Sequence, residues 1–243
     1  MSILLTIIAA LFTLGALLIA AEHRAHRVGR RRGRTDWIKF AVFLPLVLTL
    51  IMAAHHGRPA FGIILGLIAL GGSVEIYRNL HNGFRPWAAI LGFVLFLCSL
   101  GHLLIASSLA WALSVSLAVM FTASMDAFSQ LWGRLLGRRR LCPRLSPGKT
   151  VEGSAGGLLT TLALALALGS WLPRMILPRL AVLALLTALA GLAGDLIFSA
   201  VKRRLGIKDF SGLLPGHGGL LDRFDSLIVA APAYYWSWVW LMG

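Results

Sequence analysis

Long apolar runs alternate with short polar segments along nearly the whole chain. A helix needs about 20 mainly apolar residues to cross the hydrocarbon core of a bilayer. Runs of that length recur, and each predicts a membrane-spanning helix rather than a strand. The pattern predicts an all-α, polytopic integral membrane protein with about eight spans, roughly at residues 3–21, 37–54, 60–77, 87–105, 108–132, 154–172, 178–200 and 224–242.

The polar residues divide the chain into two parts. Few interrupt the predicted spans up to about residue 107, whereas acids, glycines and cations become frequent after it. We therefore expect amino-terminal transmembrane helices over 1–107 and a catalytic transmembrane region with cytoplasmic loops over 108–243. The first apolar run lacks the basic start of a secretory signal and is followed by a basic cluster, so it is expected to be a retained helix.

Composition supports a membrane protein, and charge sets the expected orientation. The chain is 58% hydrophobic and 13% charged, which excludes an ordinary soluble globular protein. A net charge of +14 could indicate a nucleic-acid partner. However, eight spans would place 20 of the 23 Lys and Arg residues on one side, leaving only Arg58, Arg174 and Arg179 on the other.

That asymmetry is what the positive-inside rule describes for cytoplasmic loops. We therefore expect an inner (plasma) membrane protein of bacterial type, with both termini on the non-cytoplasmic side and no nucleic-acid partner. The basic cytoplasmic face would attract anionic headgroups and soluble anions.

The first candidate site residue is Asp126, at the cytoplasmic end of the fifth predicted span. An ionisable side chain within a span is costly unless it faces a partner or a polar cavity. Gly133 and Gly137 follow at helical spacing and favour close approach of another helix. Asp126 is a candidate metal ligand, and the structural alternative is an ion pair with Arg134 or Arg138.

A second candidate lies between Pro143 and Gly153. Gly148-Lys149-Thr150 resembles the end of a P-loop, but the full pattern fails because its earlier glycine position holds Pro143. An anion-binding loop is still predicted, because a helix begins directly after it and helix amino termini favour phosphate. The alternative is an ordinary capped turn, and the candidate substrate-binding residues are Ser146, Lys149 and Thr150.

The longest polar interruption, Ser199–Asp225, is the third candidate. It combines carboxylates, cations and glycines, and Asp195 precedes it by one helical turn. Magnesium usually takes one or two carboxylates together with phosphate oxygens and water. We expect Asp195 and Asp222 to bind Mg²⁺, with Asp126 and Asp225 as supporting or alternative ligands; a structural ion-pair network is the alternative.

The remaining polar residues of this segment would hold phosphates and stabilise developing charge. The predicted catalytic residues are Lys202, Arg203, Lys208, Asp209, His217 and Arg223, and further substrate contacts are expected from Ser199, Gly218 and Gly219.

The run S-x-V-K-R-x4-K-D-x-S-x2-L-P-x-H-G-G-L-x-D-R-F-D, over Ser199–Asp225, resembles the signature of the phosphatidate cytidylyltransferases, also called CDP-diacylglycerol synthases. Ser146–Gly153 and Asp126–Gly137 resemble two further segments of that family, and the resemblance covers about residues 120–230. It implies a metal-dependent enzyme that condenses CTP with phosphatidate to give CDP-diacylglycerol and pyrophosphate. Mg²⁺ is the implied cofactor, and a second, monovalent cation is left open.

Two departures from the family pattern concern the choice of lipid. Phe198 stands where the family often has a glutamate, and Ala-Phe-Ser-Gln follows Asp126 where many members have small residues and then Ala-Tyr. Two alternatives stay open: a cytidylyltransferase for another lipid phosphate, and a non-enzymatic protein that binds anionic lipid. A homodimer is also compatible with the sequence.

Overall fold

A computed structural model describes residues 2–25, 30–80, 111–172, 176–213 and 218–242, with the single positions 94, 98, 101 and 102. The long helices in this part of the chain are α1 (Ser2–Ala25), α2 (Arg30–His56), α3 (Arg58–Leu80), α5 (Trp111–Leu136), α6 (Val151–Gly169), α7 (Leu177–Arg204) and α8 (Leu221–Met242).

These helices confirm the predicted helical membrane fold. Six of them, all except α8, are long and apolar enough to cross a membrane. The predicted first three spans and the fifth to eighth each coincide with a helix, and α8 falls outside the six although it has 22 residues. The predicted span at 87–105 lies almost wholly outside the described residues.

Within the described residues, a short hairpin is the one regular element that the apolar pattern did not predict. β1 (Arg140–Cys142) and β2 (Ser146–Thr150) pair antiparallel between α5 and α6. The carboxylate of Glu152, in the first turn of α6, accepts hydrogen bonds from the backbone N–H groups of Arg138 and Arg139. The segment predicted as an anion-binding loop, Pro143–Gly153, therefore consists of the hairpin turn, strand β2 and the first residues of α6.

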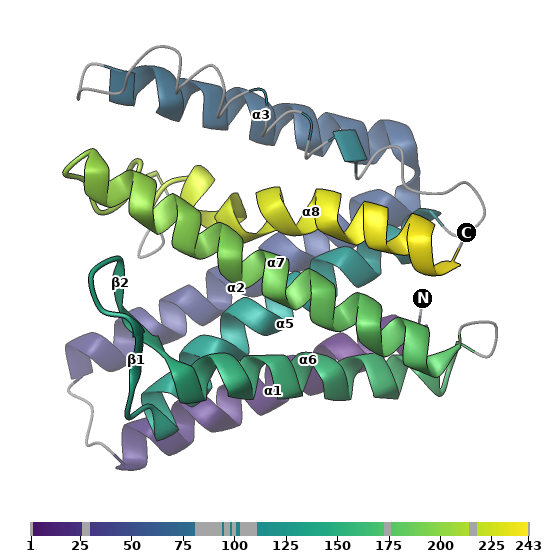
Figure 1. Ribbon diagram of the computed structural model, residues 1–243, viewed down its shortest axis with the longest axis horizontal. Coiled ribbons are helices and arrows are strands. Elements are labelled where there is room, and N and C mark those ends of the chain that lie inside the picture. The colour runs from purple at the N-terminus through teal and green to yellow at the C-terminus, as the bar shows by residue number, and fades with distance from the viewer. Residues whose placement is uncertain are drawn as a thin grey trace.

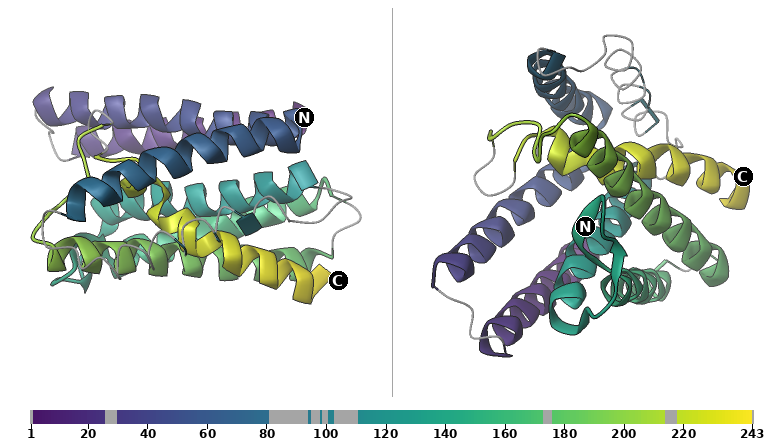
Figure 2. Two further views of the ribbon diagram at one scale, coloured as in Figure 1. Left: turned by 90° about the horizontal axis from the view of Figure 1, so that it is seen from above. Right: turned by 60° about the vertical axis from the view of Figure 1, so that its left-hand side comes forward.

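Helices α2, α6 and α8 run opposite to α1, α3, α5 and α7, which gathers the polar elements at one end of the bundle (Figures 1 and 2). The hairpin, the carboxyl ends of α1, α5 and α7, and the start of α8 share that end. The start of α1 and the end of α8 lie at the opposite end.

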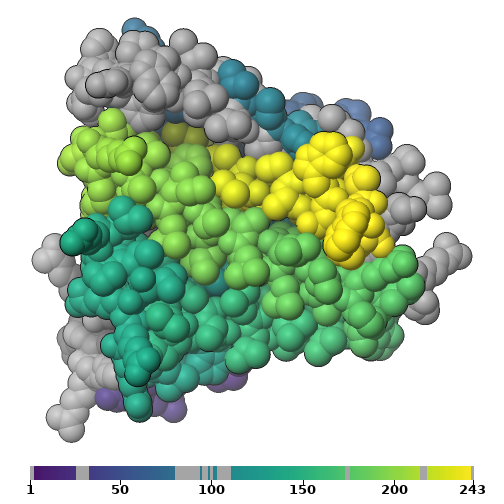
Figure 3. Space-filling view, in the orientation of Figure 1, coloured from purple at the N-terminus to yellow at the C-terminus, as the bar shows by residue number. Residues whose placement is uncertain are grey.

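Helices α6, α7 and α8 lie side by side on one face of the molecule (Figure 3) and expose large apolar side chains. Large side chains such as Leu159, Ile197 and Trp240 are 66%, 52% and 77% exposed. Exposed apolar surface of this extent suits contact with lipid rather than water.

Helix α5 is the centre of the bundle, and glycines let α6 approach it closely. A Cβ added to Gly153 would lie 2.5 Å from the carbonyl oxygen of Ser129 and 2.7 Å from the Cα of Gly133. This confirms the close helix approach predicted at Gly133. Small residues allow such backbone contact between membrane helices.

Replacing Gly153 by valine should therefore destabilise the α5–α6 contact, by about 1–3 kcal/mol on the usual scale of overpacking. We expect a lower thermal unfolding temperature in detergent. Gly148→Val is the matched control, because a Cβ at Gly148 would meet nothing within 4 Å. Equal unfolding temperatures for the two variants would contradict the proposed packing role.

Candidate functional site

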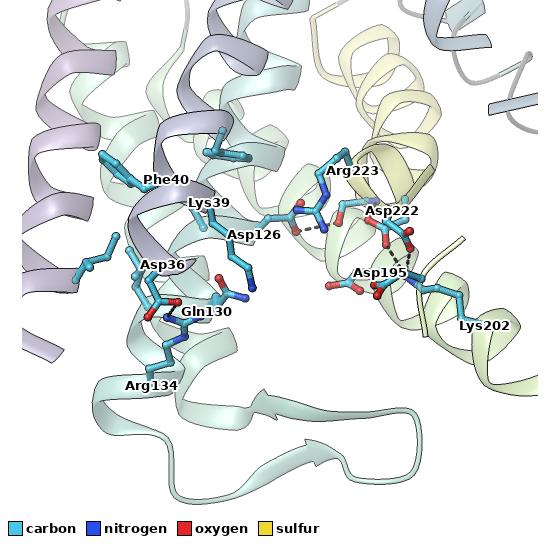
Figure 4. Close-up of a pocket in the computed structure, with 17 residues that line it drawn as sticks. Asp36, Lys39, Phe40, Asp126, Gln130, Arg134, Asp195, Lys202, Asp222 and Arg223 are labelled. Atoms are coloured by element: carbon cyan, nitrogen blue, oxygen red, sulfur yellow. Dashed lines mark hydrogen bonds and ion pairs between the residues drawn. The ribbon is translucent and has the colours of Figure 1, made fainter. Parts of the chain in front are cut away.

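At the polar end of the bundle, a cavity of about 250 Å³ opens between α2, α5, α7 and α8. Six of the nine acidic residues of the chain line it. Four basic side chains also line it, so acids exceed cations by two. Figure 4 shows most of these charged groups, which are Asp36, Asp126, Asp195, Asp209, Asp222 and Asp225 with Lys39, Arg134, Lys202 and Arg223.

Lys202 joins α7 to α8 by a buried ion pair. Its Nζ lies 2.7 Å from Oδ1 of Asp222 and 3.5 Å from Oδ2 of Asp225. The ring of Phe210 covers the ammonium group at 5.6 Å from its centroid. Buried charges are stable only when paired and hydrogen bonded, and this arrangement meets that requirement.

The two acids predicted as the metal pair have different surroundings. Asp222 is buried, and its Oδ2 accepts hydrogen bonds of 2.8 Å from the backbone N–H groups of Phe210 and Gly219. Asp195 is more open, with a side chain 28% exposed. It forms an ion pair with Lys149 and accepts a 3.3 Å hydrogen bond from Ser199.

Asp126 and Asp225 are connected through Ser226, a residue that the sequence analysis did not single out. The Ser226 hydroxyl donates to Oδ1 of Asp126 at 2.9 Å, and its backbone N–H donates to Oδ1 of Asp225 at 2.8 Å. Arg134, one of the two predicted alternative partners of Asp126, pairs instead with Asp36 at 2.9 Å.

The amino-terminal helices also contribute to the pocket, which sequence reasoning missed. Asp36 and Lys39 of α2 line it. Arg134 of α5 ties α2 to α1, because it contacts both Asp36 and, at 3.4 Å, Glu22. The sequence feature that could have identified Asp36 and Lys39 is their helical spacing, which places both on one face of α2.

Glu75 of α3 contacts the loop that precedes α8. It is buried and accepts a 2.6 Å hydrogen bond from the Ser211 hydroxyl. It also accepts from the backbone N–H groups of Leu220 and Leu221, at 2.7 and 2.9 Å. Because the first N–H groups of a helix lack intrahelical partners, Glu75 satisfies donors at the start of α8 and holds the preceding loop.

Two glycines predicted to bind substrate pack against carboxylates. Gly218 has φ +78°, and a Cβ there would lie 2.9 Å from Oδ2 of Asp222. A Cβ on Gly219 would lie 2.7 Å from both carboxylate oxygens of Glu75. Their contact with substrate stays a prediction, while the structure gives each a local reason to be glycine.

Other predicted residues lie outside the pocket lining. The Thr150 hydroxyl accepts from the N–H of Gly153 and caps α6, as the capped-turn alternative describes. Arg203 is exposed and donates to the carbonyl of Leu145 in the hairpin. Ser146 and Lys208 do not line the cavity either, and His217 lies outside the described residues.

Phe198, which departs from the family pattern, packs beside the site. Its ring lies 6.2 Å from that of Phe210 in an edge-on arrangement. Since Phe210 covers Lys202 and donates its N–H to Asp222, Phe198 supports these groups from outside the cavity.

An apolar helical bundle with a carboxylate- and cation-lined pocket at one end defines a polytopic membrane protein suited to phosphate chemistry. Residues 1–240 match the cytidylyltransferase family, and the chain belongs to that family. This confirms the family relationship inferred from Ser199–Asp225, and with it the assignment to the nucleotidyltransferase enzymes.

Relatives with curated descriptions agree with this assignment. A phosphatidate cytidylyltransferase of Rickettsia bellii is 27% identical over 229 residues, which cover 90% of this chain and 97% of that protein. The uncharacterized protein YnbB of Escherichia coli is 44% identical over 125 residues, covering 51% of this chain and 42% of that protein. A phosphatidate cytidylyltransferase of Bacillus subtilis is 42% identical over 114 residues, covering 46% and 42%. The chain thus aligns with less than half of the last two relatives.

The contacts of Glu75 generate a prediction about the loop before α8. Glu75→Gln replaces one accepting oxygen by an N–H group, so a buried backbone donor loses its partner at a cost of about 1–3 kcal/mol. We expect faster hydrogen exchange at Leu220 and Leu221. Glu152→Gln is the control, because Glu152 also accepts from backbone N–H groups but at the hairpin. Unchanged exchange in Glu75→Gln would contradict its role in holding the loop.

Proposed function

We propose that the protein transfers the cytidylyl group of CTP to phosphatidate, giving CDP-diacylglycerol and pyrophosphate at the cytoplasmic edge of the membrane. The observation that carries this proposal is the convergence of six carboxylates and four cations on one pocket at the end of an apolar bundle. Family membership and the named activity of the Rickettsia and Bacillus relatives support it.

The reaction depends on neutralising the negative charge of the substrates more than on proton transfer. A phosphate oxygen of the lipid attacks the α-phosphorus of CTP, and the bond to the β-phosphate breaks so that pyrophosphate leaves. The attacking phosphate is already anionic, so a strong general base is unnecessary. Fixed cations must bring two anions together and stabilise the leaving group. Arg223 suits this task, because it lines the pocket and its buried Nε has no hydrogen-bond partner among the described residues.

The donor set fits a divalent cation. Two more acids than cations line the pocket, and Mg²⁺ is bound by carboxylates together with substrate phosphates. Asp195, Asp126 and Asp225 are the carboxylates best placed to hold it. Asp222 already accepts three hydrogen bonds, one from Lys202 and two from the backbone, so it has less capacity left for a metal ion. A bound Mg²⁺ would neutralise phosphate charge in the pocket.

The proposed orientation has eight crossings, both termini on the non-cytoplasmic side and the pocket facing the cytoplasm. Its support is the asymmetry of 20 against 3 basic residues and the positive-inside rule. The hairpin and the pocket would then meet CTP directly in the cytoplasm, while the lipid arrives from the inner leaflet.

Asp195→Asn and Asp222→Asn should each lower Mg²⁺-dependent transfer from labelled CTP to phosphatidate by about 100-fold or more. Asp195→Asn removes a charged metal ligand, and Asp222→Asn removes the charge that pairs with Lys202. EDTA should stop the wild-type reaction, and added Mg²⁺ should restore it. The control is Glu152→Gln, at the hairpin and outside the pocket lining. Wild-type rates in both aspartate variants would exclude the proposed roles.

The same assay separates the alternatives. Pyrophosphate release with an isoprenoid or ether-lipid phosphate, but not with phosphatidate, would change the acceptor and keep the reaction class. Magnesium-independent lipid binding without any pyrophosphate release would indicate a binding protein instead.

Orientation can be tested with single cysteines after replacement of Cys98 and Cys142 by serine. A cysteine at Arg144, in the exposed hairpin turn, should react with an impermeant maleimide only from the cytoplasmic side. One at Ser170, at the opposite end where α6 ends, should react only from the other side. The reverse labelling pattern would invert the proposed topology.

A further inference from the structure

The face of α2 that lines the pocket changes from polar to apolar along the helix axis. Its lining residues follow at helical spacing and face one way; from the polar end inward they are Asp36, Lys39, Phe40 and Phe43. The facing part of α5 is mixed, because Leu131 and Ala127 alternate there with Arg134, Gln130 and Asp126. An amphiphile with one anionic end would match the gradient on α2.

An apolar groove continues from the pocket between α1, α2 and α5. It is narrow, about 60 Å³, and shares four lining residues with the pocket, namely Phe40, Phe43, Ala127 and Leu131. Its other lining residues include Gly15 of α1 and Ala123 of α5. A Cβ on Gly15 would lie 3.2 Å from the ring of Phe40, so this glycine keeps α1 close to the groove wall.

One polar group in the groove has no partner. Ser124 lines it and is 3% exposed, yet its hydroxyl makes no hydrogen bond among the described residues. An unpaired buried hydroxyl costs free energy that a hydrogen-bond acceptor would recover. An ester carbonyl next to a hydrocarbon chain supplies such an acceptor in apolar surroundings.

Lys39 is the cation at the mouth of this groove. It precedes Phe40, lines the pocket, and extends from α2 toward the pocket's centre (Figure 4). The other cation on this side, Arg134, is already paired with Asp36 and Glu22. Within the described residues Lys39 has no ion pair, so its ammonium group is available to an anionic ligand.

We propose that the lipid-phosphate acceptor binds between α1, α2 and α5, with its phosphate at Lys39, an ester carbonyl at Ser124 and the adjoining methylenes of an acyl chain in the groove. The nucleotide then occupies the side of the pocket formed by α7 and α8. This inference rests on the proposed function, because it assigns the two substrates of that reaction to opposite walls of one cavity.

Steady-state kinetics of the full-length protein in detergent would test this assignment. Lys39→Ala should raise the KM for phosphatidate about tenfold or more, since charge-assisted contacts to phosphate are strong, and should change the KM for CTP less than about twofold. Lys39→Arg should restore most of the affinity. A rise confined to the KM for CTP would overturn the placement of Lys39.

Chain length provides a separate test of the groove. Ala123→Phe should fill the groove and raise the KM for dioleoyl phosphatidate, while the KM for dihexanoyl phosphatidate stays near that of the wild type. Leu17→Phe is the control, because Leu17 lies on α1 outside the groove lining and is 62% exposed. Equal effects of Ala123→Phe on both lipids, or no effect on either, would exclude an acyl-chain site there.

A binding measurement tests the lipid site independently of the proposed reaction. Phosphatidate with a diazirine in its acyl chain should crosslink to peptides of α1, α2 or α5, and unlabelled phosphatidate should compete. Labelling restricted to α6–α8 would overturn the subsite even in an active enzyme. Competed labelling of α1, α2 or α5 without any cytidylyl transfer would support the lipid site and reject the reaction.

Discussion

The site depends on the burial of Lys202 between Asp222 and Asp225. Removing one partner from a buried ion pair typically costs about 3–5 kcal/mol, because the remaining charge is left uncompensated. This pairing fixes α7 against α8. Asp222 also accepts the N–H groups of Phe210 and Gly219, so the same carboxylate folds the connecting loop back onto the helices. Charge neutralisation at the membrane edge therefore determines both the local fold and the shape of the pocket.

The amino-terminal helices are also held at the pocket by the need to neutralise buried charges. Arg134 of α5 neutralises Asp36 and Glu22, which brings α1 and α2 to the pocket. Glu75 of α3 accepts the backbone N–H groups at the start of α8. A carboxylate at the end of an apolar helix is stable only with such partners. The pocket consequently draws on both parts of the chain, although the recognisable signature lies in the second.

The position of the pocket suits a reaction between a soluble anion and a lipid. Its charged groups lie at the polar end of the bundle, while α6, α7 and α8 expose large apolar side chains that suit contact with lipid. Excess carboxylates on the pocket wall would repel phosphates without a bound cation. A divalent ion and Arg223 together would provide the positive charge that two polyanionic substrates need.

The helical membrane fold follows from the sequence alone, because apolar runs of bilayer length leave a chain few other ways to satisfy the hydrogen bonds of its backbone. The sequence also identified the family through Ser199–Asp225, and the close helix contact at Gly133. The strand at Ser146–Thr150, the contribution of Lys39 to the pocket and the role of Glu75 at the start of α8 became evident only from the three-dimensional structure. The structure also separated Asp195 from Asp222, because only the fold determines which carboxylate oxygens are occupied by hydrogen bonds from the backbone. These features depend on partners far apart in sequence, which local periodicity and composition do not encode.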